Sequence, residues 1–194
     1  FDYIIETEKK YGFNSSFYFM TSEDKDHYDC DYDVTSDKIQ NLFKQINENN
    51  NEVGIHPNYF TYNKENKFTE QVEKLRDNTP YNDFGGRQHY LRFDIKKTVD
   101  LYENNNLLYD STLSFPDRAG FRCGTSHPFP VFSLSQNKVL DLWEIPLIVM
   151  DSSLKGDKNM NLEPKEALIH IKLLIDRVNK YNRVFILLWH NSSF

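Results

Sequence analysis

Three short segments of the chain each join a histidine to a strand-like run, and their side chains are the best candidates for chemistry. Histidine can transfer protons or bind a metal near neutral pH. The clearest of these histidines is His190, which follows six apolar residues rich in branched and aromatic side chains. Such a run is typical of a strand buried on both faces of a parallel sheet. The three segments are residues 52–57, 86–91 and 184–191.

The ends of these strands are where we expect the site to lie. In parallel sheets covered by helices, polar residues at the carboxyl ends of strands build the site, because the loops open to solvent there. His56 and Arg87 are expected at the same edge as His190. Gly54 and Pro57 flank the first histidine closely and suit a sharp turn at the end of a strand, which favours exposure of His56 to a cleft.

Alternating helical and strand-like patterns run through the rest of the chain and would position these ends. The pattern favours an α/β fold with a mostly parallel sheet or barrel. Helices are expected over residues 1–11, 39–46, 68–77, 97–104 and 164–178, strands over 15–20, 52–56, 107–110, 142–150 and 184–189, and a long loop over 115–132. Asp151, at the end of the fourth strand, could also face the cleft.

Composition limits the classes of protein that the chain can be. Its 194 residues suffice for one domain with a sizeable core. The net charge of −6 argues against a nucleic-acid partner, and no apolar run is long enough to span a membrane. The two cysteines show no paired spacing, which argues against a disulfide framework or a thiolate zinc site. Neither composition nor motif separates a cytoplasmic from an envelope-associated protein.

An acidic segment between the first strand and the second helix carries aspartates at alternate positions. The spacing of Asp29, Asp31 and Asp33 resembles the start of a calcium loop, but Val34 stands where that loop needs glycine and Gln40 where it needs glutamate. We therefore expect a solvated loop.

Five segments together resemble the polysaccharide deacetylase (NodB-homology) superfamily, in a divergent bacterial subgroup. The resemblance is collinear and covers nearly the whole chain. It rests on residues 9–19 (KKYGFNSSFYF), 52–56 (EVGIH), 86–91 (GRQHYL), 108–112 (LYDST) and 187–191 (LLWHN). It implies a deformed (β/α) barrel, truncated at both ends. Residues 1–194 would then form one incomplete domain that starts inside a helix and stops just after a strand.

The resemblance also implies an activity and roles for single residues. Members of the superfamily use a divalent metal, commonly zinc, held by an aspartate and two histidines, to remove an acyl group from an amide nitrogen of a carbohydrate. Carried over to this chain, His56 would bind the metal and His190 would be the general acid. Arg87 would orient a catalytic carboxylate, Tyr90 would donate its backbone N–H to the oxyanion, and Asp110 would tune Arg87 or His190 through a charge-assisted hydrogen bond.

The chain departs from the family pattern at two points. The Asp-Asp motif, which supplies the general base and one metal ligand, belongs on a strand before the first helix and is absent from these residues. The family's second histidine follows the first by four positions, where this chain has Phe60. We expect His89 to substitute as the second metal ligand.

Each assignment has a plainer alternative. The histidines could be structural, Arg87 could form a surface ion pair, Tyr90 could pack in the core, and Asp110 could cap Thr112 in a turn.

The leading hypothesis is thus a carbohydrate N-deacetylase-like hydrolase that acts on an N-acetylated glycan or its precursor. The second is a catalytically degenerate barrel that binds glycan or serves as a structural module in a cell-envelope polysaccharide system. The third is an α/β domain whose histidines are all structural.

Overall fold

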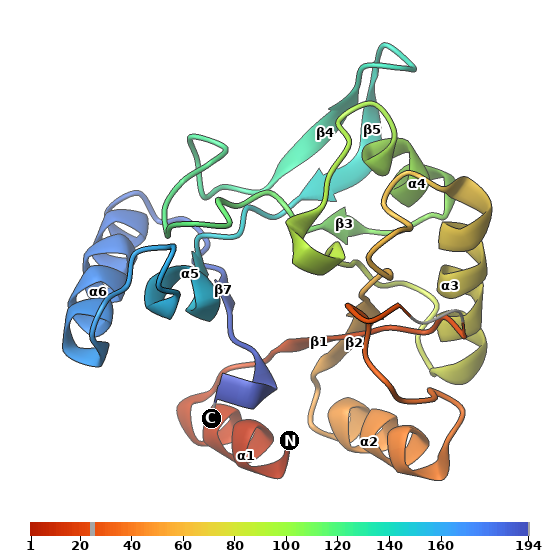
Figure 1. The fold of residues 1–194 in the computed structure, drawn as a ribbon, viewed down its shortest axis with the longest axis horizontal. Helices are drawn as coiled ribbons and strands as arrows, with labels where there is room; N and C mark the ends of the chain where they lie inside the picture. The colour runs from red at the N-terminus through yellow and green to blue at the C-terminus, as the bar shows by residue number, and fades with distance from the viewer. Residues whose placement is uncertain (24–25, 194) are drawn as a thin grey trace.

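The computed structural model describes residues 1–23 and 26–193, which form helices interspersed with strands (Figure 1). The helices are α1 (Asp2–Tyr11), α2 (Asp37–Glu48), α3 (Glu65–Asn78), α4 (Thr98–Asn104), α5 (Asp151–Lys155) and α6 (Pro164–Lys180), with short 3-10 turns at His89–Leu91 and Asn191–Ser193. The strands are β1 (Ser16–Phe19), β2 (Glu52–Ile55), β3 (Tyr109–Asp110), β4 (Phe129–Ser133), β5 (Lys138–Glu144), β6 (Val149–Met150) and β7 (Leu187–Leu188).

Most strands pair in parallel, as the sequence predicted. β1 pairs with β2, and single bridges through Gly86 link Ile55 of β2 to Asp110 of β3. β3 pairs in parallel with β5, β4 returns antiparallel to β5, and β6 pairs in parallel with β7. The α/β class is therefore confirmed. Among the described residues these strands do not close into a ring, so the closed barrel stays a prediction.

Amphipathic helices cover the strands because their apolar faces need a buried surface. α2 and α3 pack against β2, α4 against β3 and β5, and α5 against β6 and α6 (Figure 1). The largest core cluster includes Phe43 and Ile46 of α2, Phe68 and Leu75 of α3, and Ile55 of β2. Each such side chain contributes about 2 kcal/mol of hydrophobic stabilisation when fully buried. This core fixes the ends of β2 and β3, from which the site is built.

Two predicted strands differ from the structure. The run 142–150 is interrupted after Glu144, since Pro146 has no N–H to continue a ladder, and it contributes to both β5 and β6. The final run 184–189 was predicted to be a strand buried on both faces. Only Leu187 and Leu188 form a ladder, Leu187 is 46% exposed, and within the described residues their sole strand partner is β6.

Single residues set the ends of two helices. Gly12 stops α1 in a left-handed conformation with φ 72°, and its N–H bonds back to the carbonyls of Glu8 and Lys9. Pro164 opens α6, where Glu163 and Glu166 form a reciprocal capping box. No helix in the described part of the chain is both long and apolar enough to cross a membrane.

Candidate functional site

His56 and His89 lie beside each other, with ring centroids 4.9 Å apart. The Nδ1 atom of His56 is 2.6 Å from the backbone carbonyl of Arg87, and Nδ1 of His89 is 3.3 Å from Oδ1 of Asp29. A carbonyl or carboxylate oxygen can only accept, so Nδ1 carries the hydrogen in both rings. In the neutral rings, Nε2 is left with its lone pair. A histidine held in this way is typical of a metal ligand.

Both imidazoles are held in their neutral form. Burial, with a smaller contribution from the neighbouring His89, lowers the pKa of His56 to about 3. Burial also lowers the pKa of His89, although its hydrogen bond to Asp29 acts in the opposite direction. Neutral imidazole is the form that binds metal ions.

Backbone pairing sets the position of His56. Ile55, at the end of β2, accepts a hydrogen bond from the N–H of Arg87 at 3.1 Å, which brings the Arg87 carbonyl next to His56. Gly86 makes this approach possible, because a Cβ there would lie 2.5 Å from Cγ2 of Ile55. The glycine before the arginine is thus a packing requirement of the site.

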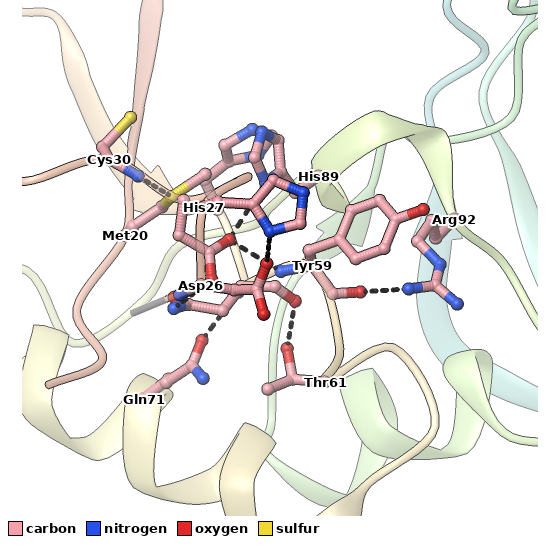
Figure 2. Close-up of polar contacts among 12 residues, drawn as sticks. Met20, Asp26, His27, Cys30, Tyr59, Thr61, Gln71, His89 and Arg92 are labelled. Atoms are coloured by element: carbon pink, nitrogen blue, oxygen red, sulfur yellow. Dashed lines mark hydrogen bonds and ion pairs between the residues drawn. The ribbon is translucent and has the colours of Figure 1, made fainter. Parts of the chain in front are cut away.

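Asp29 holds His89 from the other side. Its side chain is only 2% exposed, and its two carboxylate oxygens accept the Tyr59 N–H and the Asn58 side-chain amide, each at 2.9 Å. Figure 2 shows these polar contacts around His89 and Tyr59. The prediction of a solvated loop is therefore wrong for Asp29. Nothing in the sequence distinguishes it from Asp31 or Asp33.

His190 is oriented by Asp151. Its Nδ1 lies 2.6 Å from Oδ1 of Asp151, and its backbone N–H is 3.3 Å from Oδ2. The Ser193 hydroxyl also donates to Oδ2. Burial alone would raise the pKa of Asp151, but the hydrogen bonds from His190 and Ser193 outweigh it and lower that pKa to about 2. The carboxylate is thus charged at neutral pH and fixes the ring of His190, whose side chain is 49% exposed.

Arg87 is buried, so the alternative of a surface ion pair is wrong. Its Nε donates to the Ser111 carbonyl and one terminal nitrogen donates to the Ser111 hydroxyl, each at 2.8 Å. The guanidinium also lies over the ring of Tyr18, 5.0 Å from its centroid. These contacts fix the orientation of its charge.

Asp110 takes its hydrogen bond from the Thr112 hydroxyl, at 2.5 Å. This is the turn-capping alternative, and in the described structure it replaces the predicted hydrogen bond to Arg87 or His190. The residue lies in a buried cluster with Glu144, and burial raises the pKa of both carboxyls, that of Asp110 to about 6. The positive charge of Arg87 acts against this increase. The pair therefore favours binding a proton, and the link from Asp110 to Arg87 is electrostatic.

Tyr90 is 61% exposed, which rules out the alternative of core packing. Phe60, at the position of the family's second histidine, is also exposed and packs edge-on against Tyr59. The predicted role of the Tyr90 N–H toward an oxyanion stays a prediction.

One cavity of about 1090 Å³ is lined by most of the candidate residues, although Asp110 and Asp151 are not among them. His56, His89 and His190 all line it, together with Arg87 and Tyr90. Two histidine nitrogens suit a divalent metal, but within residues 1–23 and 26–193 no group of three His, Cys, Asp or Glu side chains is placed to hold one. The described part of the chain thus places two histidines with fixed tautomers and a third, oriented histidine around the same cavity.

Two comparisons by sequence found no relative. No protein-family model matches the chain. No curated protein matches it significantly either.

A comparison of structures did find a likeness. The fold matches the crystal structure of a putative polysaccharide deacetylase from Mycobacterium smegmatis with a TM-score of 0.67 at 14% sequence identity. The match covers 96% of this chain and 62% of that chain. At this identity the likeness shows the fold alone, and the family stays a prediction.

Proposed function

We propose that this chain provides the site of a metal-dependent hydrolase that removes an acetyl group from an amide nitrogen of a carbohydrate. The observation that carries the proposal is the shared cavity, in which two neutral histidines lie near a third that is fixed by a carboxylate. The fold likeness to a putative polysaccharide deacetylase supports the carbohydrate substrate and the C–N bond as the target.

His56 and His89 would hold the metal through their Nε2 atoms. A divalent ion such as zinc, when bound there, would supply a Lewis acid for the amide carbonyl and activate water. The contribution of the protein is to keep both rings neutral and oriented, through the Arg87 carbonyl and the Asp29 carboxylate. Such outer contacts raise the basicity of the ligand and fix its tautomer.

His190 would act as general acid toward the departing amine. Asp151 holds the Nδ1 hydrogen, so the proton for the amine nitrogen would come from Nε2. The carboxylate also fixes the orientation of the ring that this step needs. The backbone N–H of Tyr90 would donate to the oxyanion. Arg87 would orient a catalytic carboxylate of the kind that the Asp-Asp motif supplies in the superfamily.

A second candidate function is a glycan-binding or structural module without catalysis, as in a cell-envelope polysaccharide system. The presence of Phe60 in place of a histidine and the two-ligand set of the described residues favour it.

Metal content and acetate release test the proposal. We would load the protein with zinc, remove excess ion, and measure bound metal by mass spectrometry for the wild type, His56→Ala and His89→Ala. His127→Ala, which changes an exposed histidine, is the matched control. The proposal expects about one equivalent of metal in the wild type and the control, and loss in the other two variants.

Acetate release from a β-1,4-linked N-acetylglucosamine tetramer is measured on the same samples. Release that depends on metal and on His190 supports the hydrolase. A metal-loaded protein that releases no acetate from this or other N-acetylated glycans contradicts it and favours the binding module.

A further inference from the structure

The ring of Tyr90 is displayed to solvent by an unusual backbone. Tyr90 and Leu91 both have left-handed φ values, 55° and 53°, which are rare for side chains of this size. Such strain costs about 1–2 kcal/mol per residue and persists where the surrounding structure enforces it, often at functional sites. In this conformation Tyr90 is 61% exposed, while its ring centroid is 4.7 Å from that of His89.

The ring of Tyr59 packs against that of Tyr90 and is itself held by two neighbours. Tyr28 stacks nearly parallel on Tyr59 at 4.1 Å, and the guanidinium of Arg92 lies 4.1 Å from the same ring centroid. Two groups this close to one centroid must occupy opposite faces, so both faces of Tyr59 are covered. Figure 2 shows Tyr59 between His89 and Arg92.

The open face of Tyr90 follows from this arrangement. The rings of Tyr59 and Tyr90 are 5.3 Å apart and perpendicular, with an angle of 87°. Since the faces of Tyr59 are covered, it is the edge of Tyr59 that meets a face of Tyr90. We infer that one face of Tyr90 rests on Tyr59. Since Tyr90 as a whole is 61% exposed, the ring also presents open surface to solvent beside His89.

We propose that the open face of Tyr90 is a stacking subsite for a pyranose ring of the carbohydrate chain, next to the sugar that reacts. This inference rests on the proposed function and adds a residue that determines how the glycan binds. A pyranose offers a flat face of C–H groups to an aromatic ring and hydroxyls at its rim. The exposed Lys64, whose ammonium lies 5.8 Å from the centroid of the nearby Phe60 ring, supplies a polar partner for such hydroxyls.

The size of the patch fits a sugar better than a protein. Its exposed rings are those of Tyr28, Phe60 and Tyr90, which are 37%, 44% and 61% exposed. A stable protein interface needs about 800 Å² from each partner, several times what three partly exposed rings provide. The subsite also adjoins the candidate metal ligands, since His89 touches both Tyr90 and His56.

The test is glycan binding to metal-free protein, measured by calorimetry with a β-1,4-linked N-acetylglucosamine tetramer. Tyr90→Asn removes the ring but tolerates the left-handed backbone, and Tyr90→Phe keeps the ring. Tyr181→Asn changes an equally exposed tyrosine far along the chain, at the end of α6. We expect Kd to increase about three- to tenfold in Tyr90→Asn and to stay unchanged in the other two variants. Circular dichroism checks that each variant is folded.

The outcomes separate this inference from the proposed function. If acetate is released but Tyr90→Asn binds the tetramer as the wild type does, the subsite is wrong and the hydrolase stands. If no acetate is released but binding depends on the ring of Tyr90, the subsite stands and the hydrolase is wrong. A wild-type protein that does not bind the tetramer overturns the subsite, and so does Tyr90→Phe that binds as weakly as Tyr90→Asn.

Discussion

The imidazole of His190 donates its Nδ1 hydrogen to the carboxylate of Asp151 at 2.6 Å, although the two residues are 39 positions apart. Asp151 is the first residue of α5 and directly follows β6, while His190 lies just after β7. Since β6 and β7 pair in parallel, the two residues emerge from the same edge of the strand pair. The pairing of two short strands is thus what brings this acid and this base together.

We expect Asp151→Asn to reduce kcat for acetate release by roughly 10²–10⁴-fold, because the ring of His190 loses both its fixed tautomer and the neighbouring charge. Bound metal, measured on the same sample, should stay at the wild-type level. Asp157→Asn, on an exposed carboxylate shortly after α5, should retain wild-type kcat. A normal kcat in Asp151→Asn would show that His190 is not the general acid.

Metal affinity should depend on Asp29. Asp29→Asn weakens the contact that orients His89, and loss of such a contact commonly costs 10- to 100-fold in metal affinity. Competition with a zinc-binding dye would measure the change. Asp31→Asn, an exposed aspartate two positions along the same loop, is the control and should bind zinc normally. Equal zinc affinity in Asp29→Asn and the wild type would show that Asp29 does not contribute to metal binding.

Stability should depend on pH through the buried carboxyl of Asp110. Its pKa is about 6 in the folded protein and about 3.9 in an unfolded chain, so folding strengthens proton binding. Proton binding to Asp110 therefore adds to the free energy of unfolding. This stabilisation is fully present below pH 4 and is lost as the pH rises through 6, at up to about 1.4 kcal/mol per pH unit. Asp110→Asn mimics the protonated form. We therefore expect it to gain about 1–3 kcal/mol of stability relative to the wild type between pH 4 and pH 7.

Urea unfolding of both proteins at several pH values gives this difference directly. Comparison with the wild type cancels the opposite contribution of Asp151, whose lowered pKa favours folding above the acidic range. A difference in the free energy of unfolding that does not change with pH would mean that Asp110 is already charged in the folded protein.

Gly86→Ala should disrupt the site through the backbone. The added Cβ would lie 2.5 Å from Cγ2 of Ile55 and 2.7 Å from its carbonyl oxygen, so β2 and the Arg87 segment must move apart. We expect a loss of about 1–3 kcal/mol in unfolding free energy together with weaker zinc binding. Gly124→Ala is the control: its Cβ would meet open space but the backbone has a left-handed φ of 70°, so stability should decrease while zinc binding stays intact. Wild-type affinity in Gly86→Ala would show that the Arg87 carbonyl does not need its present position.

The sequence predicted what depends on repeating patterns. The apolar periodicity of the helices and the strand-like run before His56 were enough to predict the α/β class and the place of that histidine. Asp151 was visible as a polar residue at the end of a strand, but its pairing with His190 requires knowing that β6 and β7 are neighbours. Asp29 carried no signal that set it apart from Asp31 and Asp33, because its burial results from loops that meet only in the folded chain.

The last strand shows why burial on both faces was overpredicted. Residues 184–189 have the composition of a central strand, yet a ladder needs partners as well as propensity, and the described structure offers one on a single side. The composition of a segment shows that it can form a buried strand. The number of neighbouring strands decides how many of its residues do so.

The hydrogen-bond partner of His56 is a main-chain carbonyl, which every amino acid at position 87 would provide. The orientation of this histidine is therefore insensitive to side-chain replacement at its partner, whereas His89 depends on one particular carboxylate. Random substitutions at the partner residues would therefore disturb the orientation of His89 more often than that of His56. In a mutagenesis library, most substitutions at position 29 should weaken metal binding. Substitutions at position 87 should leave the tautomer of His56 intact, even where they abolish the function of the arginine.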